Sequence, residues 1–158
     1  VDIPRAIENF NFFANFSENF YFESNIESEV SINSVSRQAL GVVGCISPWN
    51  LPLYLFTWKI APALIVGNTV LAKPSEITPL TASKLAKICS DIGLPAGVLN
   101  IVNGSGQLAG DLLVKNKNIK AISFTGGTDT GKKIYQNSFS SLKKLSLEMG
   151  GKNPAIIF

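Results

Sequence analysis

The sequence predicts an α/β fold built on a doubly wound, mostly parallel sheet. From Gly41 onward, short apolar runs of strand length alternate with segments of helical periodicity. The runs are continuously apolar, which is typical of parallel strands that are buried on both faces. A sheet of this kind is covered by helices on both sides and binds ligands at the carboxyl ends of its strands.

Two segments precede this alternating region. Residues 1–16 carry apolar side chains at helical spacing, with Pro4 in the first turn, so we expect an N-terminal helix there. Residues 17–38 are rich in Ser, Asn and Glu and alternate weakly between apolar and polar, which favours a hairpin-like projecting arm. Because this arm is polar on both sides, its strand register is weakly specified unless a partner covers it.

The alternating region, residues 39–158, supplies the strands and helices of the predicted domain. We expect strands over residues 41–46, 69–72, 98–102, 121–124, 142–147 and 155–158. The clearest helix covers residues 79–92, with Thr78 as N-cap, Pro79 at the first helical position and Gly93 at its end. Its expected apolar stripe consists of Leu85, Ile88, Cys89 and Ile92.

Composition excludes several classes of protein. With 46% hydrophobic and 16% charged residues, the 158-residue chain has the composition of a folded domain. Its net charge of +3 comes from scattered lysines, so we expect no nucleic-acid partner. No apolar run approaches the roughly 18 to 20 residues of a membrane span. Because we also find no secretory signal, we expect a cytoplasmic protein with no membrane partner.

The two cysteines and the absence of histidine restrict the catalytic groups and metal sites that this chain can form. Cys45 and Cys89 each lie in an apolar segment without a basic neighbour, so we expect core residues in a reducing compartment. The chain contains no histidine, which excludes a Ser-His or Cys-His pair and an imidazole metal site within these residues. We expect no bound metal.

Both ends of the sequence indicate a piece of a longer protein. Val1 begins almost directly in a helical pattern, and residues 155–158 form an apolar run without a polar tail. An uncovered apolar strand at a terminus favours aggregation, and complete domains tend to cover it. We therefore expect the parent protein to continue beyond Phe158.

Two charged residues follow a predicted strand in the position where α/β folds bind ligands. Lys73 and Glu76 come directly after residues 69–72. An ammonium and a carboxylate there can hydrogen-bond the hydroxyls of a ribose. The alternative is a surface turn in which Pro74 fixes the bend and Glu76 caps the next helix.

Two glycines follow the predicted strand over residues 121–124. Gly126 and Gly127 stand between this strand and a helical segment, where the backbone can approach a phosphate at the helix N-terminus. The spacing differs from the G-x-G-x-x-G dinucleotide fingerprint, and an ordinary strand-to-helix turn explains it equally well.

Two further residues have the character of catalytic groups. Asn50 follows the first apolar strand, where a rigidly held amide can donate to a developing oxyanion. The alternative for Asn50 is the N-cap of the following helix. Glu148 ends another apolar run, where partial desolvation favours a general base, whereas the alternative is an ion pair with Lys152.

Together these motifs resemble the NAD(P)-dependent aldehyde dehydrogenase superfamily. The resemblance spans about residues 4–158 and is carried by Ser47-Pro48-Trp49-Asn50, Gly67-Asn68-Thr69, Lys73-Pro74-Ser75-Glu76, Phe124-Thr125-Gly126-Gly127-Thr128 and Leu147-Glu148-Met149-Gly150-Gly151-Lys152. It implies a Rossmann-like cofactor domain that includes the N-terminal helix. It also implies that residues 17–38 belong to the oligomerisation arm of a homodimer or homotetramer.

The resemblance implies a role for individual residues. Asn50 would be the oxyanion-hole amide, and Glu148 would be the base that activates the hydrolytic water. Lys73 and Glu76 would hold the adenosine ribose, and Glu76 would favour NAD over NADP by repelling a 2′-phosphate. The other cofactor contacts would come from Ile46, Ser47, Pro48, Trp49, Ser75, Gly106, Phe124, Thr125, Gly126, Gly127, Met149 and Gly150, together with Glu148.

The implied activity is the oxidation of an aldehyde to its acid through a thiohemiacetal and a thioester. Residues 47–54 and 143–148 look most like the 2-aminomuconic or 2-hydroxymuconic semialdehyde dehydrogenases within the superfamily. Gly127 departs from the usual serine of the family, and the nucleophilic cysteine would lie beyond Phe158. We therefore expect residues 1–158 alone to be inactive.

Other functions stay open at this point. One is an inactive nucleotide-binding module, and another is an oligomerisation module that binds no dinucleotide. A third is an acylating dehydrogenase that uses coenzyme A, against which Glu148 at the water-activating position argues.

Overall fold

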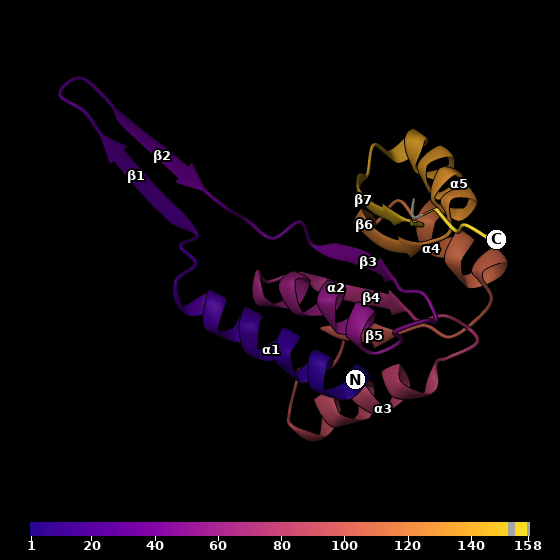
Figure 1. Ribbon diagram of the computed structural model, residues 1–158. Helices are drawn as coiled ribbons and strands as arrows, with labels where there is room; N and C mark the ends of the chain where they lie inside the picture. Colours follow the sequence, from indigo (N-terminus) through magenta and orange to yellow (C-terminus); the bar gives the residue numbers. More distant parts are fainter. Residues whose placement is uncertain (152–153, 158) are drawn as a thin grey trace.

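A five-stranded parallel sheet forms the centre of the molecule in a computed structural model that describes residues 1–151 and 154–157 (Figure 1). Its strands have the spatial order β5-β4-β3-β6-β7. They are β3 (Val42–Ile46), β4 (Thr69–Lys73), β5 (Leu99–Ile101), β6 (Ile119–Gly126) and β7 (Lys144–Met149). The chain builds outward from β3 to β5 and then returns to the other side of β3, which confirms the doubly wound prediction.

Helices connect the strands and cover both faces of the sheet (Figure 1). The α-helices are α1 (Asp2–Glu18), α2 (Tyr54–Ile65), α3 (Leu80–Asp91), α4 (Asp111–Lys115) and α5 (Thr128–Ser138). The π-helix η1 (Gly106–Gly110) leads directly into α4, and the 3₁₀ turn η2 (Phe139–Ser141) follows α5. No helix in the described part of the chain is long and apolar enough to cross a membrane.

The core has two layers because neighbouring residues of a strand point to opposite faces. On one face, Cys45 of β3 belongs to a buried cluster with Phe56 and Ile60 of α2. On the other face, Phe124 of β6 belongs to a cluster with Ile134 of α5 and residues of α4. Burial on both faces explains why the strands are continuously apolar in the sequence.

Helix α1 packs along α2 and caps it. The Asp2 carboxylate accepts hydrogen bonds from the backbone N–H groups of Leu53 (3.0 Å) and Tyr54 (2.9 Å) at the start of α2. The buried amide of Asn9 donates to the Tyr54 carbonyl (3.0 Å) and to the Thr57 hydroxyl (2.9 Å). The two Asp2 bonds satisfy N-terminal donors that an α-helix otherwise leaves without a partner.

Residues 17–38 contain an antiparallel hairpin that extends away from the sheet domain (Figure 1). Its strands are β1 (Glu23–Glu27) and β2 (Ile32–Ser36), and every residue in both is exposed. Ser28 and Ser31 close the turn through a backbone hydrogen bond of 2.8 Å from the Ser28 N–H. The hairpin has the shape of a projecting arm, whereas its role in oligomerisation stays a prediction.

Strand β6 (Ile119–Gly126) is longer than the predicted residues 121–124, and the last two strand predictions were wrong. Strand β7 covers Lys144–Met149 instead of residues 142–147, because Leu142 adopts a left-handed conformation at the end of η2. Residues 155–157 are not a strand, since a strand needs a hydrogen-bonded neighbour and Ile157 is 95% exposed. Phe158 lies outside the described residues.

The predicted helix over residues 79–92 is present, but its cap and its buried face differ from expectation. Pro79 occupies the N-cap position, and the buried Thr78 hydroxyl makes no hydrogen bond. The helix buries Ala82, and Leu85 packs against the core as predicted, whereas Ile88 and Ile92 are exposed. The stripe that faces the sheet is thus rotated around the helix relative to the prediction, because the apolar periodicity alone does not fix its exact position.

Removal of the Asp2 cap is expected to destabilise the fold. Asp2→Ala leaves two N-terminal donors of α2 unsatisfied, and we expect a loss of about 1 kcal/mol in the free energy of unfolding, measured by urea denaturation. Asp91→Ala is the matched control, because Asp91 is exposed and pairs with the exposed Lys87 on the same helix (2.9 Å). Equal losses in the two variants would contradict a capping role for Asp2.

Candidate functional site

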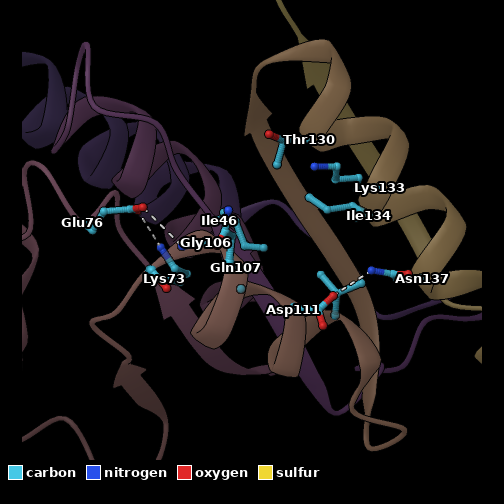
Figure 2. A pocket seen from close by; sticks show the side chains of 13 residues that line it. Ile46, Lys73, Glu76, Gly106, Gln107, Asp111, Thr130, Lys133, Ile134 and Asn137 are labelled. Carbon is cyan, nitrogen blue, oxygen red and sulfur yellow. Dashed lines mark hydrogen bonds and ion pairs between the residues drawn. The ribbon is translucent and has the colours of Figure 1, made fainter.

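A cavity of about 560 Å³ opens beyond the carboxyl ends of β3 and β4 (Figure 2). One wall comes from the end of β4 and the loop that follows, a second from η1 and α4, and the third from α5. Strand β3 lies at the point where the chain reverses its direction of winding, and doubly wound folds bind ligands at this switch point. The volume is that of a small-molecule site.

Lys73 and Glu76 form an ion pair on the first wall. The Lys73 ammonium is almost completely buried and lies 3.3 Å from the Glu76 carboxylate. It also donates to the Pro74 carbonyl (3.2 Å). The other Glu76 oxygen accepts a hydrogen bond from the backbone N–H of Gly106 (3.3 Å). Glu76 therefore links the β4–α3 loop to the start of η1.

These contacts keep Glu76 ionised. The pKa of Glu76 is lowered, first by its own backbone N–H, and further by the Gly106 N–H and by Lys73, although partial burial opposes the shift. The predicted alternative, in which Glu76 caps the next helix, is wrong because α3 has no side-chain cap. Half of the carboxylate side chain stays exposed at the cavity.

The end of β3 supplies one cavity residue and one unsatisfied hydroxyl. Ile46 lines the cavity, and the next residue, Ser47, is buried. The Ser47 hydroxyl makes no hydrogen bond within the described residues. Because buried polar groups nearly always have a partner, this hydroxyl is a candidate contact for a ligand. Pro48 is half-buried, and Trp49 is 60% exposed.

Asn50 is exposed just before α2 and is not its N-cap. The first N–H groups of α2 are bound by Asp2, and the helix begins with Leu53 in the N-cap position. The N-cap alternative for Asn50 is therefore wrong. Its amide forms no hydrogen bond with the described part of the chain and is available to another group.

Strand β6 ends beneath the glycine turn. Phe124 is buried, and a Cβ atom on Gly126 would lie only 2.5 Å from its ring. Phe124 therefore supports the turn from inside the core, and only glycine allows this close approach. Gly127 is the N-cap of α5, and a Cβ there would meet no atom within 4 Å. The half-buried Thr125 precedes them in β6.

Glu148 lies at the exposed end of β7 and lines a second cavity of about 460 Å³. This cavity is on the opposite face of the sheet, where it also contacts Cys45, Lys59 and Ser123. Because successive strand residues alternate in direction, Glu148 cannot share a face with Leu147, which packs in the core. The alternative ion pair with Lys152 falls outside the described residues.

Lys59 is the most unusual charged group near Glu148. Its side chain is buried, and its ammonium donates to the Ser123 hydroxyl (3.1 Å). Burial lowers the pKa of Lys59, although Cys45 and Glu148 favour the charged form. The folded state therefore releases this proton at lower pH than the unfolded chain. The cost of burying the ammonium is full below the folded-state pKa and falls as pH rises toward 10.5.

Sequence reasoning missed several residues of the two cavities. Lys59 could have been found as a lysine inside an otherwise apolar helix. On α5, Thr130, Lys133 and Asn137 line the first cavity, and their spacing places them on one helix face. Other missed residues of this cavity include Gln107 and Asp111.

The other predicted cofactor residues lie near the strand ends without lining the first cavity. The Ser75 hydroxyl accepts from the Ile77 N–H at 3.4 Å. Met149 covers Gly131 of α5 so closely that a Cβ there would collide with its sulfur. Gly150 donates its N–H to the Gly126 carbonyl (3.2 Å).

Neither cysteine has the environment of a nucleophile. Burial raises the pKa of Cys45 to about 12, and burial also raises the pKa of Cys89. Both prefer the thiol form at neutral pH. Cys45 is a core residue as predicted, whereas Cys89 is only half-buried and lies outside the two core clusters. Within residues 1–151 and 154–157, no group of three or more His, Cys, Asp or Glu side chains is placed to hold a metal ion.

Known proteins are similar to this chain in sequence and in architecture. The aldehyde dehydrogenase family profile matches residues 1–158. The 2-aminomuconic semialdehyde dehydrogenase of Homo sapiens is 52% identical over 159 residues, which cover 100% of this chain and 33% of that protein. The 5-carboxymethyl-2-hydroxymuconate semialdehyde dehydrogenase of Escherichia coli is 46% identical over 158 residues, again 100% of this chain and 33% of that protein.

Solved structures of similar sequence have the same architecture. PnpE from Pseudomonas sp. WBC-3, crystallised in complex with nicotinamide adenine dinucleotide, is 41% identical with a TM-score of 0.91. The match covers 96% of this chain and 31% of that one. The chain thus spans about a third of the length of these relatives. Because the family profile matches it from end to end, this chain belongs to the aldehyde dehydrogenase family.

Proposed function

We propose that residues 1–158 form the nucleotide-binding part of an enzyme that oxidises an aldehyde to a carboxylic acid with a nicotinamide dinucleotide. The observation that carries the proposal is the arrangement of Lys73, Glu76 and Gly106 around one cavity at the switch point of the sheet. The relatives are named as semialdehyde dehydrogenases, which supports the oxidation of an aldehyde as the reaction class.

The first cavity has the groups that an adenosine nucleotide requires. The ionised Glu76 can accept hydrogen bonds from ribose hydroxyls, and Lys73 can donate to them. The unsatisfied hydroxyl of Ser47, the residue after Ile46 of the cavity wall, would be a further contact of the cofactor. At the glycine turn, the N-terminus of α5 offers N–H donors to a pyrophosphate. The bound nicotinamide would accept a hydride from the substrate.

We propose NAD as the preferred cofactor over NADP. Glu76 carries its negative charge at the position proposed for the ribose, where it repels a 2′-phosphate. A solved relative, PnpE, binds nicotinamide adenine dinucleotide, which supports this choice.

Asn50 and Glu148 are the proposed catalytic residues of this segment. The Asn50 amide would donate to the oxygen of the carbonyl as it becomes negatively charged. The Glu148 carboxylate would take a proton from the water that releases the product acid. Glu148 lines the second cavity together with Lys59.

The proposed substrate is a small aldehyde of the semialdehyde class. This proposal rests on the relatives named as 2-aminomuconic and 5-carboxymethyl-2-hydroxymuconate semialdehyde dehydrogenases. We also propose a cytoplasmic location, because both cysteines are free thiols, as in proteins from reducing compartments.

The hairpin β1–β2 is the proposed oligomerisation arm of a homodimer or homotetramer. Both of its faces are exposed, and it carries uncovered apolar side chains such as Ile26 (66% exposed) and Ile32 (67% exposed). An isolated two-stranded hairpin is marginally stable in water, and a second subunit can cover its surfaces and pair with its edges.

Removing the charge of Glu148 and removing that of Glu76 are expected to change different kinetic constants of the complete protein. Glu148→Gln should lower kcat by about 10²- to 10⁴-fold, because an amide cannot accept the proton of water. Glu76→Gln should raise the KM for NAD about tenfold and leave kcat nearly unchanged, because charged hydrogen bonds to the ribose are lost. Steady-state kinetics measure both effects. Glu29→Gln at the hairpin turn is the exposed control.

The proposed roles predict this separation of kcat and KM. If Glu148→Gln behaved like Glu29→Gln, the base would have to be another residue. If Glu76→Gln lowered kcat without a change in KM, Glu76 would not be a ground-state contact of the cofactor.

The isolated 158-residue chain is expected to be inactive. Cys45 is buried with a pKa of about 12, and the pKa of Cys89 is also raised, so neither supplies a thiolate at neutral pH. Mixing the chain with NAD and an aldehyde should give no NADH absorbance. In parallel, a thiol reagent should label Cys45 only after unfolding. Sustained, aldehyde-dependent NADH formation by the isolated chain would contradict this expectation.

Charges on the hairpin are expected to break the oligomer. In the complete protein, the double change Ile26→Asp and Ile32→Asp should shift the sedimentation coefficient toward that of a monomer, because buried carboxylates without partners are costly. Ile92→Asp is the control, since Ile92 is 77% exposed at the end of α3, away from the arm. An unchanged oligomer in the hairpin variant would exclude the arm from the subunit interface.

A further inference from the structure

The loop between β5 and η1 contains the only Asn-Gly pair of the 158-residue sequence, Asn103-Gly104. Asparagine is among the thermolabile residues of proteins, because the backbone nitrogen of the next residue can attack its carboxamide carbon. The attack is least hindered when the next residue is glycine, which has no side chain beside that nitrogen. The sequence of this loop is therefore the one most open to deamidation in the chain.

The atoms that would react are accessible at this pair. Asn103 is exposed, and its amide donates a hydrogen bond of 3.3 Å to the Ser83 hydroxyl. The Gly104 N–H makes no hydrogen bond with residues 1–151 and 154–157. Neither Asn103 nor Gly104 belongs to a helix or strand. The Gly104 nitrogen can therefore approach the carboxamide without first breaking a backbone hydrogen bond.

The two Asn-Ser pairs of the chain lack this freedom. Asn137 and Ser138 lie in α5, and the Asn137 amide donates to the Asp111 carboxylate (2.7 Å). Asn33 and Ser34 lie in β2, which is paired with β1. A regular helix or strand holds the backbone away from the cyclic geometry that the reaction requires. Both pairs are therefore natural references for the reactivity of Asn103.

The structure requires glycine at position 104. Gly104 has a φ of +150°, in the region that favours glycine, and a Cβ atom there would lie 2.9 Å from the Ala109 Cβ of η1. A larger residue would hinder the attack on Asn103, but it would also collide with η1. The close approach of this loop to η1 thus keeps the reactive pair in place.

We propose that Asn103 deamidates spontaneously and that its conversion lowers the affinity of the first cavity for nucleotides. The Gly104 nitrogen forms a bond to the side-chain carbonyl carbon of Asn103, the bond from that carbon to the amide nitrogen breaks, and ammonia leaves with the Gly104 proton. Water then opens the cyclic imide to aspartate or to isoaspartate, in which the main chain runs through the side-chain carbons. The chemical step stands alone, whereas its effect on binding rests on the proposed function.

The isoaspartate product lengthens the chain between two anchored points. On one side of Asn103, the Val102 N–H donates to the Ala72 carbonyl of β4 (2.8 Å). On the other side, the Gly106 N–H donates to the Glu76 carboxylate (3.3 Å) at the first cavity (Figure 2). Isoaspartate adds one backbone carbon between these bonds. The added carbon displaces the Gly106 N–H, so Glu76 loses a hydrogen bond that holds its carboxylate at the cavity.

The test is a time course of the complete protein in warm, mildly alkaline buffer, with Asn103→Gln as the matched variant. Glutamine keeps a carboxamide, but its extra methylene group slows the ring closure. Peptide mass spectrometry measures conversion at Asn103, Asn33 and Asn137, and ion exchange separates the modified protein by its added negative charge. We expect Asn103 to convert first and the modified protein to bind ADP-ribose about tenfold more weakly in calorimetry. Asn103→Gln should keep its initial affinity throughout.

The site and its effect on binding can be refuted separately. Conversion at Asn33 or Asn137 as fast as at Asn103 would overturn the site. A modified protein that binds ADP-ribose as tightly as the fresh protein would overturn the effect on the cavity, as would an equal loss of affinity in Asn103→Gln. If the fresh protein bound neither NAD nor ADP-ribose, the proposed cofactor function would fail, while mass spectrometry would still decide whether Asn103 deamidates.

Discussion

Burial of β3 on both faces is the constraint on which the rest of the structure depends. Its neighbours β4 and β6 run parallel to it, so the connections must cross over the sheet and cover it with helices. Gly44 at the centre of β3 shows how tight this cover is, because a Cβ there would lie 2.5 Å from a Leu113 methyl group of α4. The crossovers leave β3 in opposite directions, and the first cavity forms beyond its carboxyl end.

Lys73 and Lys59 are both buried, on opposite faces of the sheet, and they differ in the partner of the ammonium group. Lys73 has a carboxylate partner in Glu76, and this pair organises the first cavity. Among the described residues, Lys59 has only the Ser123 hydroxyl as a hydrogen-bond partner, so burial dominates and lowers its pKa. A buried lysine of this kind costs stability, which proteins accept at functional sites more readily than in an ordinary core.

Under the proposed function, the two faces of the sheet serve the two ends of one extended ligand. The ribose contacts lie with Ile46 on the α4–α5 side, whereas Glu148 opens to the cavity on the α2 side. Asn50 follows the carboxyl end of β3 in the chain and precedes α2. A dinucleotide suits this arrangement, because its adenosine and nicotinamide halves are joined by a flexible pyrophosphate.

The sequence alone determined the sheet, its winding and the motifs at the strand ends, because the apolar runs and the glycine turns are local patterns that burial on both faces enforces. It left Asn50 and Glu76 with alternative capping roles. Instead, Asp2 caps α2, and Glu76 accepts a hydrogen bond from Gly106, and both partners are far away in the sequence. The tertiary structure also decided which of two adjacent lysines, Lys132 or Lys133, reaches the cavity. Periodicity reports that a helix has a buried face, whereas the rotation of that face is set by packing against strands that the local sequence does not contain.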